Sequence, residues 1–194
     1  MQASNEEYIS KKRAIELWDS GEIDDIEVGT VKGLRDIHYA LFHDIDGYDA
    51  GEIRDVNISK GNFRFANSMY LIPALQAIEA MPEDDFDLIL DKYVEMNVAH
   101  PFIEGNGRAT RIWLDLMLKK NLGKVIDWQK VDKFDYLEFM KLSPVKSKYI
   151  KDLLRAALTD EISDRDVFMK GLDQSYRYED FDEIRAEDIG DELE

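Results

Sequence analysis

The chain has 194 residues, a formal net charge of −17, 44% hydrophobic residues and no cysteine. These values indicate a globular protein with one sizeable core, and they exclude disulfides, thiolate metal sites and a disordered chain. The acidic charge argues against direct binding of nucleic acid, and the lack of a long apolar run or a secretory signal predicts a cytoplasmic protein without membrane contact.

Apolar residues recur mostly at helical spacing, which predicts a mainly α-helical single domain. The first helix is expected to stop at Ser20-Gly21, and Thr30 suits the N-cap of the second. Further helices are predicted over 69–81, 86–99, 106–118, 129–141, 145–158 and 163–170. Only one segment breaks the pattern: residues 57–65 alternate around Lys-Gly-Asn, which predicts a short β-hairpin. Residues 178–194 carry nine acidic residues against a single Arg, which favours a solvated, partly frayed tail.

Most of the chemistry lies in the twelve residues that begin at His100: His-Pro-Phe-Ile-Glu-Gly-Asn-Gly-Arg-Ala-Thr-Arg. Residues 105–107 lie between two predicted helices, where glycines allow consecutive backbone N–H groups to form an anion nest at a helix N-terminus. Arg108 and Arg111 provide guanidiniums for phosphate oxygens. Glu104 provides an oxygen ligand for magnesium, and His100 has the near-neutral pKa of a general base.

Each of these features has a plainer interpretation when it is taken alone. A Gly-x-Gly is usually a turn, a His before Pro usually ends a helix, and a Glu near two Arg residues is usually a surface ion pair. Their joint occurrence at this spacing favours a metal-bound polyphosphate beside a general base. The segment is not a Walker P-loop, because Gly-x-x-x-x-Gly-Lys-Ser/Thr is absent.

The segment matches the Fic signature, His-x-Phe-x-Asp/Glu-Gly-Asn-Gly-Arg-x-x-Arg, at every defined position. From about residue 5 to 183 the chain resembles compact bacterial Fic proteins with a C-terminal inhibitory helix (class III), and the likeness is clearest at 27–30, 57–61, 63–67 and 113–116. The resemblance implies a protein adenylyltransferase (AMPylator), which moves AMP from ATP to a side-chain hydroxyl of Tyr, Thr or Ser in a target protein with Mg²⁺. It also implies a core at 1–170 with a flap at 57–65, an inhibitory helix at 171–185 and an acidic tail at 186–194.

Carried over by position, the resemblance makes His100 the base that deprotonates the target hydroxyl and Glu104 the magnesium ligand. Arg108 would bind on the β/γ side of the triphosphate, and Arg111 would orient the γ-phosphate. The remaining candidate ATP-binding residues are Gly105, Asn106, Gly107, Ala109, Thr110, Lys60 and Asn97. A solvated surface lysine is the alternative for Lys60, and a satisfied buried amide is the alternative for Asn97.

Near the C-terminus, Ser175 and Glu179 fit the inhibitory pattern Ser/Thr-x-x-x-Glu of the same relatives. Being four residues apart, they are expected to share a helical face, from which Glu179 would pair with Arg111 and take the place of the γ-phosphate. Tyr176 and Tyr178 flank this face and are candidates for self-modification, with packing of the helix onto the domain as the alternative. His38 and His43 are five residues apart and are expected to be ordinary helix residues.

The resemblance also implies a protein partner docked on the flap, for which a DNA topoisomerase is a candidate, and a homo-oligomer that stabilises the inhibitory helix. Two alternatives stay open at this point. The first is a Fic-fold enzyme that moves another group or removes AMP. The second is a nucleotide-responsive oligomeric binding module without catalysis.

Overall fold

The computed structural model describes residues 2–193, and it describes the side chains of residues 5–189. Its α-helices are α1 (Gln2–Asp19), α2 (Val31–Phe42), α3 (Leu71–Glu79), α4 (Phe86–Ala99), α5 (Asn106–Leu122), α6 (Lys133–Leu142), α7 (Lys148–Ala156), α8 (Arg165–Arg177) and α9 (Ala186–Leu193). Short 3-10 helices are η1 (Glu22–Asp25), η2 (Ser68–Tyr70) and η3 (Trp128–Lys130). The strands are β1 (Ser59–Lys60), β2 (Phe63–Arg64), β3 (Val125–Ile126) and β4 (Leu158–Thr159). The prediction of a mainly helical single domain is confirmed.

Polar side chains cap the N-termini of several of these helices by accepting a hydrogen bond from a backbone N–H of the first turn. The predicted N-cap Thr30 accepts from the N–H of Gly33 in α2, and Asp85 accepts from Leu88 at the start of α4. Asp132 and Asp164 do the same for α6 and α8. These bonds satisfy N–H groups that have no partner within the helix.

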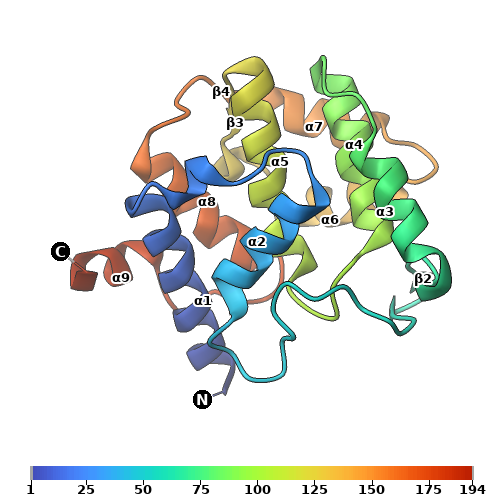
Figure 1. The fold of residues 1–194 in the computed structure, drawn as a ribbon. Helices are drawn as coiled ribbons and strands as arrows, with labels where there is room; N and C mark the ends of the chain where they lie inside the picture. Colours follow the sequence, from blue (N-terminus) through green and yellow to red (C-terminus); the bar gives the residue numbers. More distant parts are fainter. Residues whose placement is uncertain (1, 194) are drawn as a thin grey trace.

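Helix α5 runs through the centre of the molecule, between α2, α4 and α8 (Figure 1). Eleven of its seventeen residues are buried, among them the fully buried Trp113. Because α5 is buried on several sides, its first turn has a fixed position relative to α4 and α8. That turn carries the glycines and arginines singled out in the sequence.

The predicted hairpin is present, and its antiparallel register pairs Ser59 with Arg64 and Lys60 with Phe63. It lies at the edge of the molecule beside α3 (Figure 1). A second antiparallel pair, β3 with β4, was not predicted. It joins the end of α5 to the segment after α7, and each of its strands has only two residues, too few for an alternating pattern to appear.

The C-terminal part differs from the prediction in two respects. The helix expected over 163–170 and the inhibitory helix expected over 171–185 form one helix, α8, which ends at Arg177. The acidic tail is also not a frayed segment over its described part, because residues 186–193 form α9, where Ala186 and Ile189 are buried. Lys11 of α1 connects these parts, since its ammonium pairs with Asp173 of α8 at 2.8 Å and also donates to the carbonyl of Ile184.

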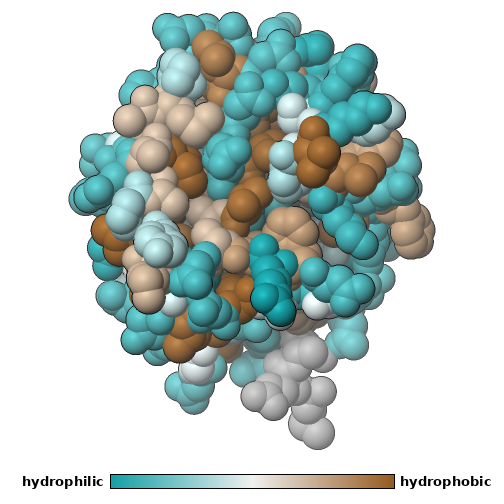
Figure 2. Space-filling view, turned by 90° about the vertical axis from the view of Figure 1, so that its right-hand side faces the viewer, coloured by the Kyte–Doolittle hydropathy of each residue, from teal (hydrophilic) through white to brown (hydrophobic). Residues whose placement is uncertain are grey.

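The surface that carries α3 and α4 mixes polar residues with exposed apolar ones (Figure 2). Met69, Tyr70 and Ile72, which follow the hairpin, are more than half exposed. Within residues 2–193, no helix combines the length and the apolar character that crossing a membrane requires.

Candidate active site

The loop that joins α4 to α5 begins at His100 and ends at Gly105, and both residues have positive φ, 51° and 73°. A Cβ on Gly105 would lie 2.5 Å from the ring of Phe42, so only glycine fits there. In this conformation the chain turns sharply into α5 and leaves its first N–H groups at the loop. The backbone at residues 105–107 therefore has the conformation that the predicted anion nest requires.

The side chains within and after the nest mostly hold the loop itself. Asn106 accepts a hydrogen bond from the N–H of Phe102 and donates to the Phe102 carbonyl, at 2.9 and 2.7 Å. Thr110 donates to the carbonyl of Asn106 at 2.7 Å, and Ala109 is fully buried. The side chains of these three candidate ATP-binding residues thus face the protein interior, and the candidate phosphate-binding groups left at this end are backbone N–H groups and the two arginines.

The ring of His100 stacks on Phe65, the residue after β2, with 3.6 Å between ring centroids. Its Nδ1 lies 3.2 Å from the carbonyl oxygen of Asn97. Since a carbonyl only accepts hydrogen bonds, Nδ1 carries the proton and Nε2 keeps its lone pair. Burial, outweighing the bond to Asn97, lowers the pKa of His100 to about 4, so the ring is neutral at pH 7 and able to accept a proton.

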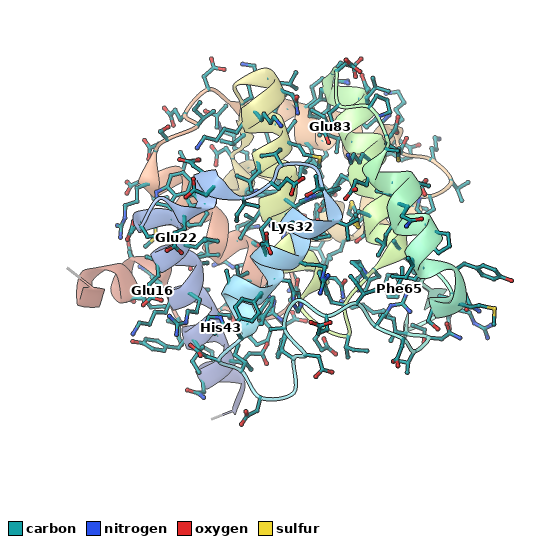
Figure 3. The ribbon with its side chains drawn as sticks, in the orientation of Figure 1. Glu16, Glu22, Lys32, His43, Phe65 and Glu83 are labelled. Carbon is teal, nitrogen blue, oxygen red and sulfur yellow. The ribbon has the colours of Figure 1, made fainter. Side chains whose placement is uncertain are left out.

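His38 supports the loop from behind, which the sequence analysis did not anticipate. Its Nδ1 accepts from the N–H of Gly51, so its Nε2 carries the proton and donates to the carbonyl of Glu104, with both bonds at 2.9 Å. Its ring stacks on Phe102 at 3.8 Å, and burial lowers its pKa to about 4. His43 lies at the far end of α2, apart from Phe65 and the flap (Figure 3).

The side chain of Glu104 is exposed at the mouth of the loop. Within the described residues, no group of three His, Asp or Glu side chains converges in a way that would hold a metal ion. A single carboxylate is nevertheless the donor expected for Mg²⁺ when substrate phosphates and water supply its other oxygen ligands. The residues present therefore fit a magnesium ion that arrives with a polyphosphate, and they do not fit a metal held by protein alone.

Arg108 and Arg111 are almost fully buried, at 2% and 4% exposure, and both meet the carboxylate of Glu179. Glu179 Oε1 lies 2.8 Å from Arg111 Nη2, and its Oε2 lies 2.9 Å from Arg108 Nε. Arg111 also donates to the hydroxyl of Ser175 at 2.6 Å and to its carbonyl at 2.8 Å. The predicted ion pair between Glu179 and Arg111 is confirmed, and Arg108 is an additional partner.

Glu179 lies just past the end of α8, in a turn in which its N–H donates to the carbonyl of Tyr176. The carboxylate reaches into the nest, because a Cβ added to Gly107 would lie 2.4 Å from Glu179 Oε1. Burial alone would raise the pKa of this carboxyl, but the charges of Arg108 and Arg111 outweigh burial and hold the pKa below its ordinary value. Glu179 is therefore an anion at the place predicted for a phosphate.

Arg108 has two further partners that sequence reasoning missed, both from distant parts of the chain. Its Nη1 lies 3.1 Å from a carboxylate oxygen of Glu6 in α1, and its Nη2 donates to the hydroxyl of Tyr48 at 2.7 Å. Tyr48 in turn donates to Glu6. No local pattern links residues 6, 48 and 108, so only the fold brings them together.

The remaining candidates lie around this centre. Lys60 is exposed on the hairpin, and its charge acts on both His100 and Glu179. Tyr176 and Tyr178 are buried at 0% and 2% exposure, and the hydroxyl of Tyr178 donates to the carbonyl of Val131 at 2.9 Å. In this conformation both rings pack α8 onto the domain, as the alternative interpretation expected.

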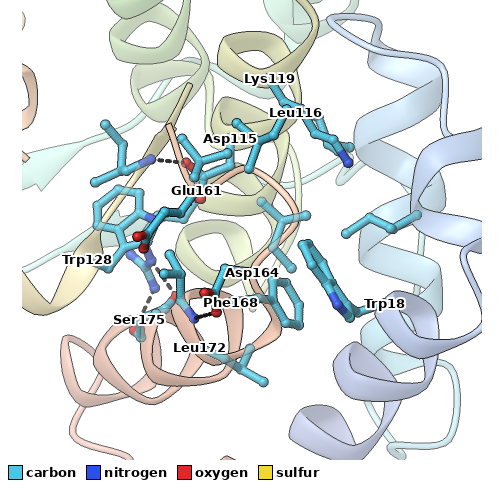
Figure 4. Close-up of a pocket in the computed structure, with 18 residues that line it drawn as sticks. Trp18, Asp115, Leu116, Lys119, Trp128, Glu161, Asp164, Phe168, Leu172 and Ser175 are labelled. Atoms are coloured by element: carbon cyan, nitrogen blue, oxygen red, sulfur yellow. Dashed lines mark hydrogen bonds between the residues drawn. The ribbon is translucent and has the colours of Figure 1, made fainter. Parts of the chain in front are cut away.

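A small cavity of about 60 Å³ lies between α1, α5 and α8 (Figure 4). Arg111 and Ser175 both line it. Its wall includes Trp18 and Phe168, which stack at 4.4 Å. Asp115 also lines the cavity, and its carboxylate accepts from the N–H of Ile126 and from the indole of Trp128. Burial, only partly offset by these two bonds, raises the pKa of Asp115 to about 7.

Known proteins resemble this chain over the region that contains the loop between α4 and α5. Residues 29–118 match the model of the Fic/DOC family. It is 33% identical over 123 residues to the probable protein adenylyltransferase Fic of Escherichia coli, and 30% identical over 138 residues to the protein adenylyltransferase VbhT of Bartonella schoenbuchensis. The matches cover 56% and 64% of this chain, but only 60% and 27% of those relatives.

Solved structures share the fold at low sequence identity. The Fic domain of Bep8 from Bartonella sp. 1-1C superposes with a TM-score of 0.66 at 16% identity and covers 86% of each chain. BepC from Bartonella tribocorum, solved with bound AMPPNP, gives a TM-score of 0.63 at 19% identity over 81% of this chain and 86% of that one. The predicted Fic-type helical fold is therefore confirmed.

Proposed function

We propose that this protein is a self-inhibited adenylyltransferase that moves AMP from ATP to a side-chain hydroxyl of Tyr, Thr or Ser in a target protein. The names of its relatives support AMP transfer as the reaction. One observation in this chain carries the proposal: His100, neutral and with Nε2 able to accept a proton, lies at the same loop as the first turn of α5 and its two arginines.

In this reaction the triphosphate binds at the N-terminus of α5, where backbone N–H groups and the helix dipole favour an anion. Arg108 and Arg111 hold the β- and γ-phosphates. His100 Nε2 takes the proton of the target hydroxyl, the hydroxyl oxygen forms a bond to the α-phosphorus, and the bond to the β-phosphate oxygen breaks so that pyrophosphate leaves. The neutral histidine thus becomes an imidazolium, which returns its proton to solvent.

Glu104 is the residue that would hold Mg²⁺ here, and the ion would neutralise charge on the phosphate oxygens when bound. Two features of this chain orient that carboxylate. His38 fixes its backbone carbonyl, and the positive φ of Gly105 turns the following chain away from it.

The hairpin would present the target. Within the described residues β1 pairs only with β2, so the two-stranded sheet keeps outer edges at which an extended segment can add by backbone hydrogen bonds. Phe65 stacks on His100 directly after the hairpin. A hydroxyl held along this edge is therefore carried toward the base.

Glu179 is the proposed brake. Its carboxylate uses both arginines and fills the space beside Gly107, so a γ-phosphate that needs the same guanidiniums must displace it. Ser175 of α8 also holds Arg111, through its hydroxyl. Tyr176 and Tyr178 become accessible to self-modification only when this end of α8 leaves the domain, because both are now buried.

The test compares wild type, Glu179→Gly and His100→Ala in cell extract with ATP labelled at the α- or the γ-phosphate. We expect weak protein labelling from α-labelled ATP in wild type, strong labelling in Glu179→Gly, and none in His100→Ala. Label from the γ-phosphate alone would indicate a kinase. No label in any variant would favour the nucleotide-responsive binding module, and loss of label from a pre-labelled target would indicate removal of AMP.

The topoisomerase target and the homo-oligomer stay predictions from the resemblance, and the cytoplasmic location stays a prediction from the sequence. The labelled proteins of the same experiment identify the target directly. Mapping the label on Glu179→Gly itself tests Tyr176 and Tyr178 as acceptors.

A further inference from the structure

Arg54 lies in the segment between α2 and the hairpin, and its guanidinium is buried at 5% exposure. It donates to four backbone carbonyls from three nitrogens. Nε donates to His100 at 2.7 Å, and Nη1 to Val56 at 2.6 Å. Nη2 donates to both Ala66 at 2.7 Å and Ala99 at 2.9 Å.

This environment is unusual for a buried charge. Within the described part of the chain, no carboxylate forms an ion pair with Arg54, and burial lowers its pKa. Buried charges are ordinarily paired, because removing an ion from water costs several kcal/mol. Here only carbonyl dipoles satisfy the guanidinium. Its role therefore depends on the rigid fork of five donors, which can hold several carbonyls at once.

The four carbonyls belong to two parts of the proposed active site. Val56 and Ala66 flank the hairpin, one before β1 and the other after β2. Ala99 is the last residue of α4, and His100, the next residue, is the proposed base. Backbone bonds run alongside: Arg54 N–H donates to Pro101 at 2.9 Å, and Ala66 N–H donates to Val98 at 3.0 Å. One side chain thus holds both ends of the hairpin against the residue that carries the base.

We propose that Arg54 is a positioning residue for group transfer: it fixes the hairpin to His100, so that a hydroxyl presented along the hairpin reaches Nε2. This inference rests on the proposed function. The guanidinium of Arg54 donates to backbone carbonyls and contacts neither of the two arginines proposed to bind the nucleotide. Its loss should therefore affect the transfer step and leave ATP binding intact.

The test uses Arg54→Met, which keeps an unbranched stem as far as the position of Nε but none of the donors, and Arg54→Lys, which keeps the charge without the fork. Arg35→Met is the matched control, because Arg35 also donates to the backbone of this segment, at Gly51, but reaches neither the hairpin nor His100. All three are made in the Glu179→Gly background. Labelling of cell-extract proteins is measured at saturating ATP, together with the KM for ATP.

For Arg54→Met we expect the rate at saturating ATP to fall by about 10- to 100-fold, as misplacement of a reacting group predicts, with the KM for ATP unchanged within about threefold. Arg54→Lys should lie between Arg54→Met and the parent, and Arg35→Met should match the parent. An unchanged rate in Arg54→Met would overturn the proposal. A rise in the KM for ATP that accounts for the whole loss would also overturn it.

Hydrogen exchange, followed by mass spectrometry, gives a readout that needs no activity. In Arg54→Met, and to a smaller degree in Arg54→Lys, exchange should accelerate in peptides covering 55–67 and 97–101 and stay unchanged in α5 and α8. Uniform acceleration would mean general destabilisation, and no acceleration would mean that Arg54 does not couple the two segments; either result overturns the proposal. If the Glu179→Gly parent itself transfers no AMP, the proposed function fails, and the exchange data still decide whether Arg54 joins the hairpin to the base.

Discussion

Replacing Glu179 by glycine should make the protein less stable in the absence of nucleotide and more active in its presence. The change removes one carboxylate that serves two buried guanidiniums. Removing one member of a buried ion pair costs about 3–5 kcal/mol, because the other charge stays buried without its partner. The arginines keep other partners, Ser175 for Arg111 and Glu6 with Tyr48 for Arg108, so the lower end of that range applies.

A loss of about 3 kcal/mol lowers the melting temperature of a domain of this size by about 6–12 °C. In the proposed mechanism the same quantity applies to ATP binding by wild type, because the triphosphate would have to displace the carboxylate before it reached the arginines. It corresponds to a factor of about 10² in affinity for the fully engaged triphosphate. Saturating ATP with Mg²⁺ should therefore raise the melting temperature of Glu179→Gly more than that of wild type.

Thermal unfolding of both proteins, with and without ATP and Mg²⁺, tests this reasoning. Asp180→Gly is the control, because Asp180 has a φ of 65°, which suits glycine, and among the described residues it pairs only with Lys133, at the surface. Glu179→Gln separates the charge from the backbone effect of glycine and should resemble Glu179→Gly. Equal melting temperatures of wild type and Glu179→Gly without ATP, or equal ATP-induced shifts, would refute the competition between carboxylate and phosphate.

Three further outcomes follow from the site. In the Glu179→Gly background, His100→Ala should reduce α-phosphate labelling by at least about 10²-fold without changing the ATP-induced shift in melting temperature, and a lost shift would make His100 a binding residue. The pKa of Asp115, about 7 against an ordinary 3.8, means that the stability it contributes falls as pH rises from about 4 to about 7; urea titrations should show wild type losing its advantage over Asp115→Asn across that window, and a constant difference would contradict the shift. His38→Phe leaves the carbonyl of Glu104 without its donor, at a cost of about 1–3 kcal/mol, and should raise the Mg²⁺ concentration for half-maximal labelling, which an unchanged Mg²⁺ titration would exclude.

Local patterns in the sequence predicted the features that depend on neighbouring residues. Thr30 caps α2 because a hydroxyl three residues before Gly33 can reach its N–H, a relation visible in the sequence. The hairpin, the turn at 105–107 and the pairing of Glu179 with Arg111 followed from a turn signal and from a family motif. In each of these cases the informative residues lie close together in the chain or belong to a known signature.

The missed features depend on long-range contacts. Arg54 is 46 residues from His100, and His38 is 66 residues from Glu104, and neither lies in a motif that would single it out. The end of α8 was misplaced for a different reason. Its buried positions include Gly171 and Ser175, which hide the apolar periodicity of a helix, so two helices were predicted where one continues.

The missing side chain of Gly107 leaves a space that matters in two states of the protein. The space where its side chain would be contains Glu179 Oε1, 2.4 Å from a virtual Cβ, and in the proposed reaction the same space receives a phosphate. Under this proposal a side chain at position 107 would clash in both states, with the carboxylate in one and with the phosphate in the other. A variant without Glu179 would be freed from only one of these two clashes, so glycine would still be required at position 107.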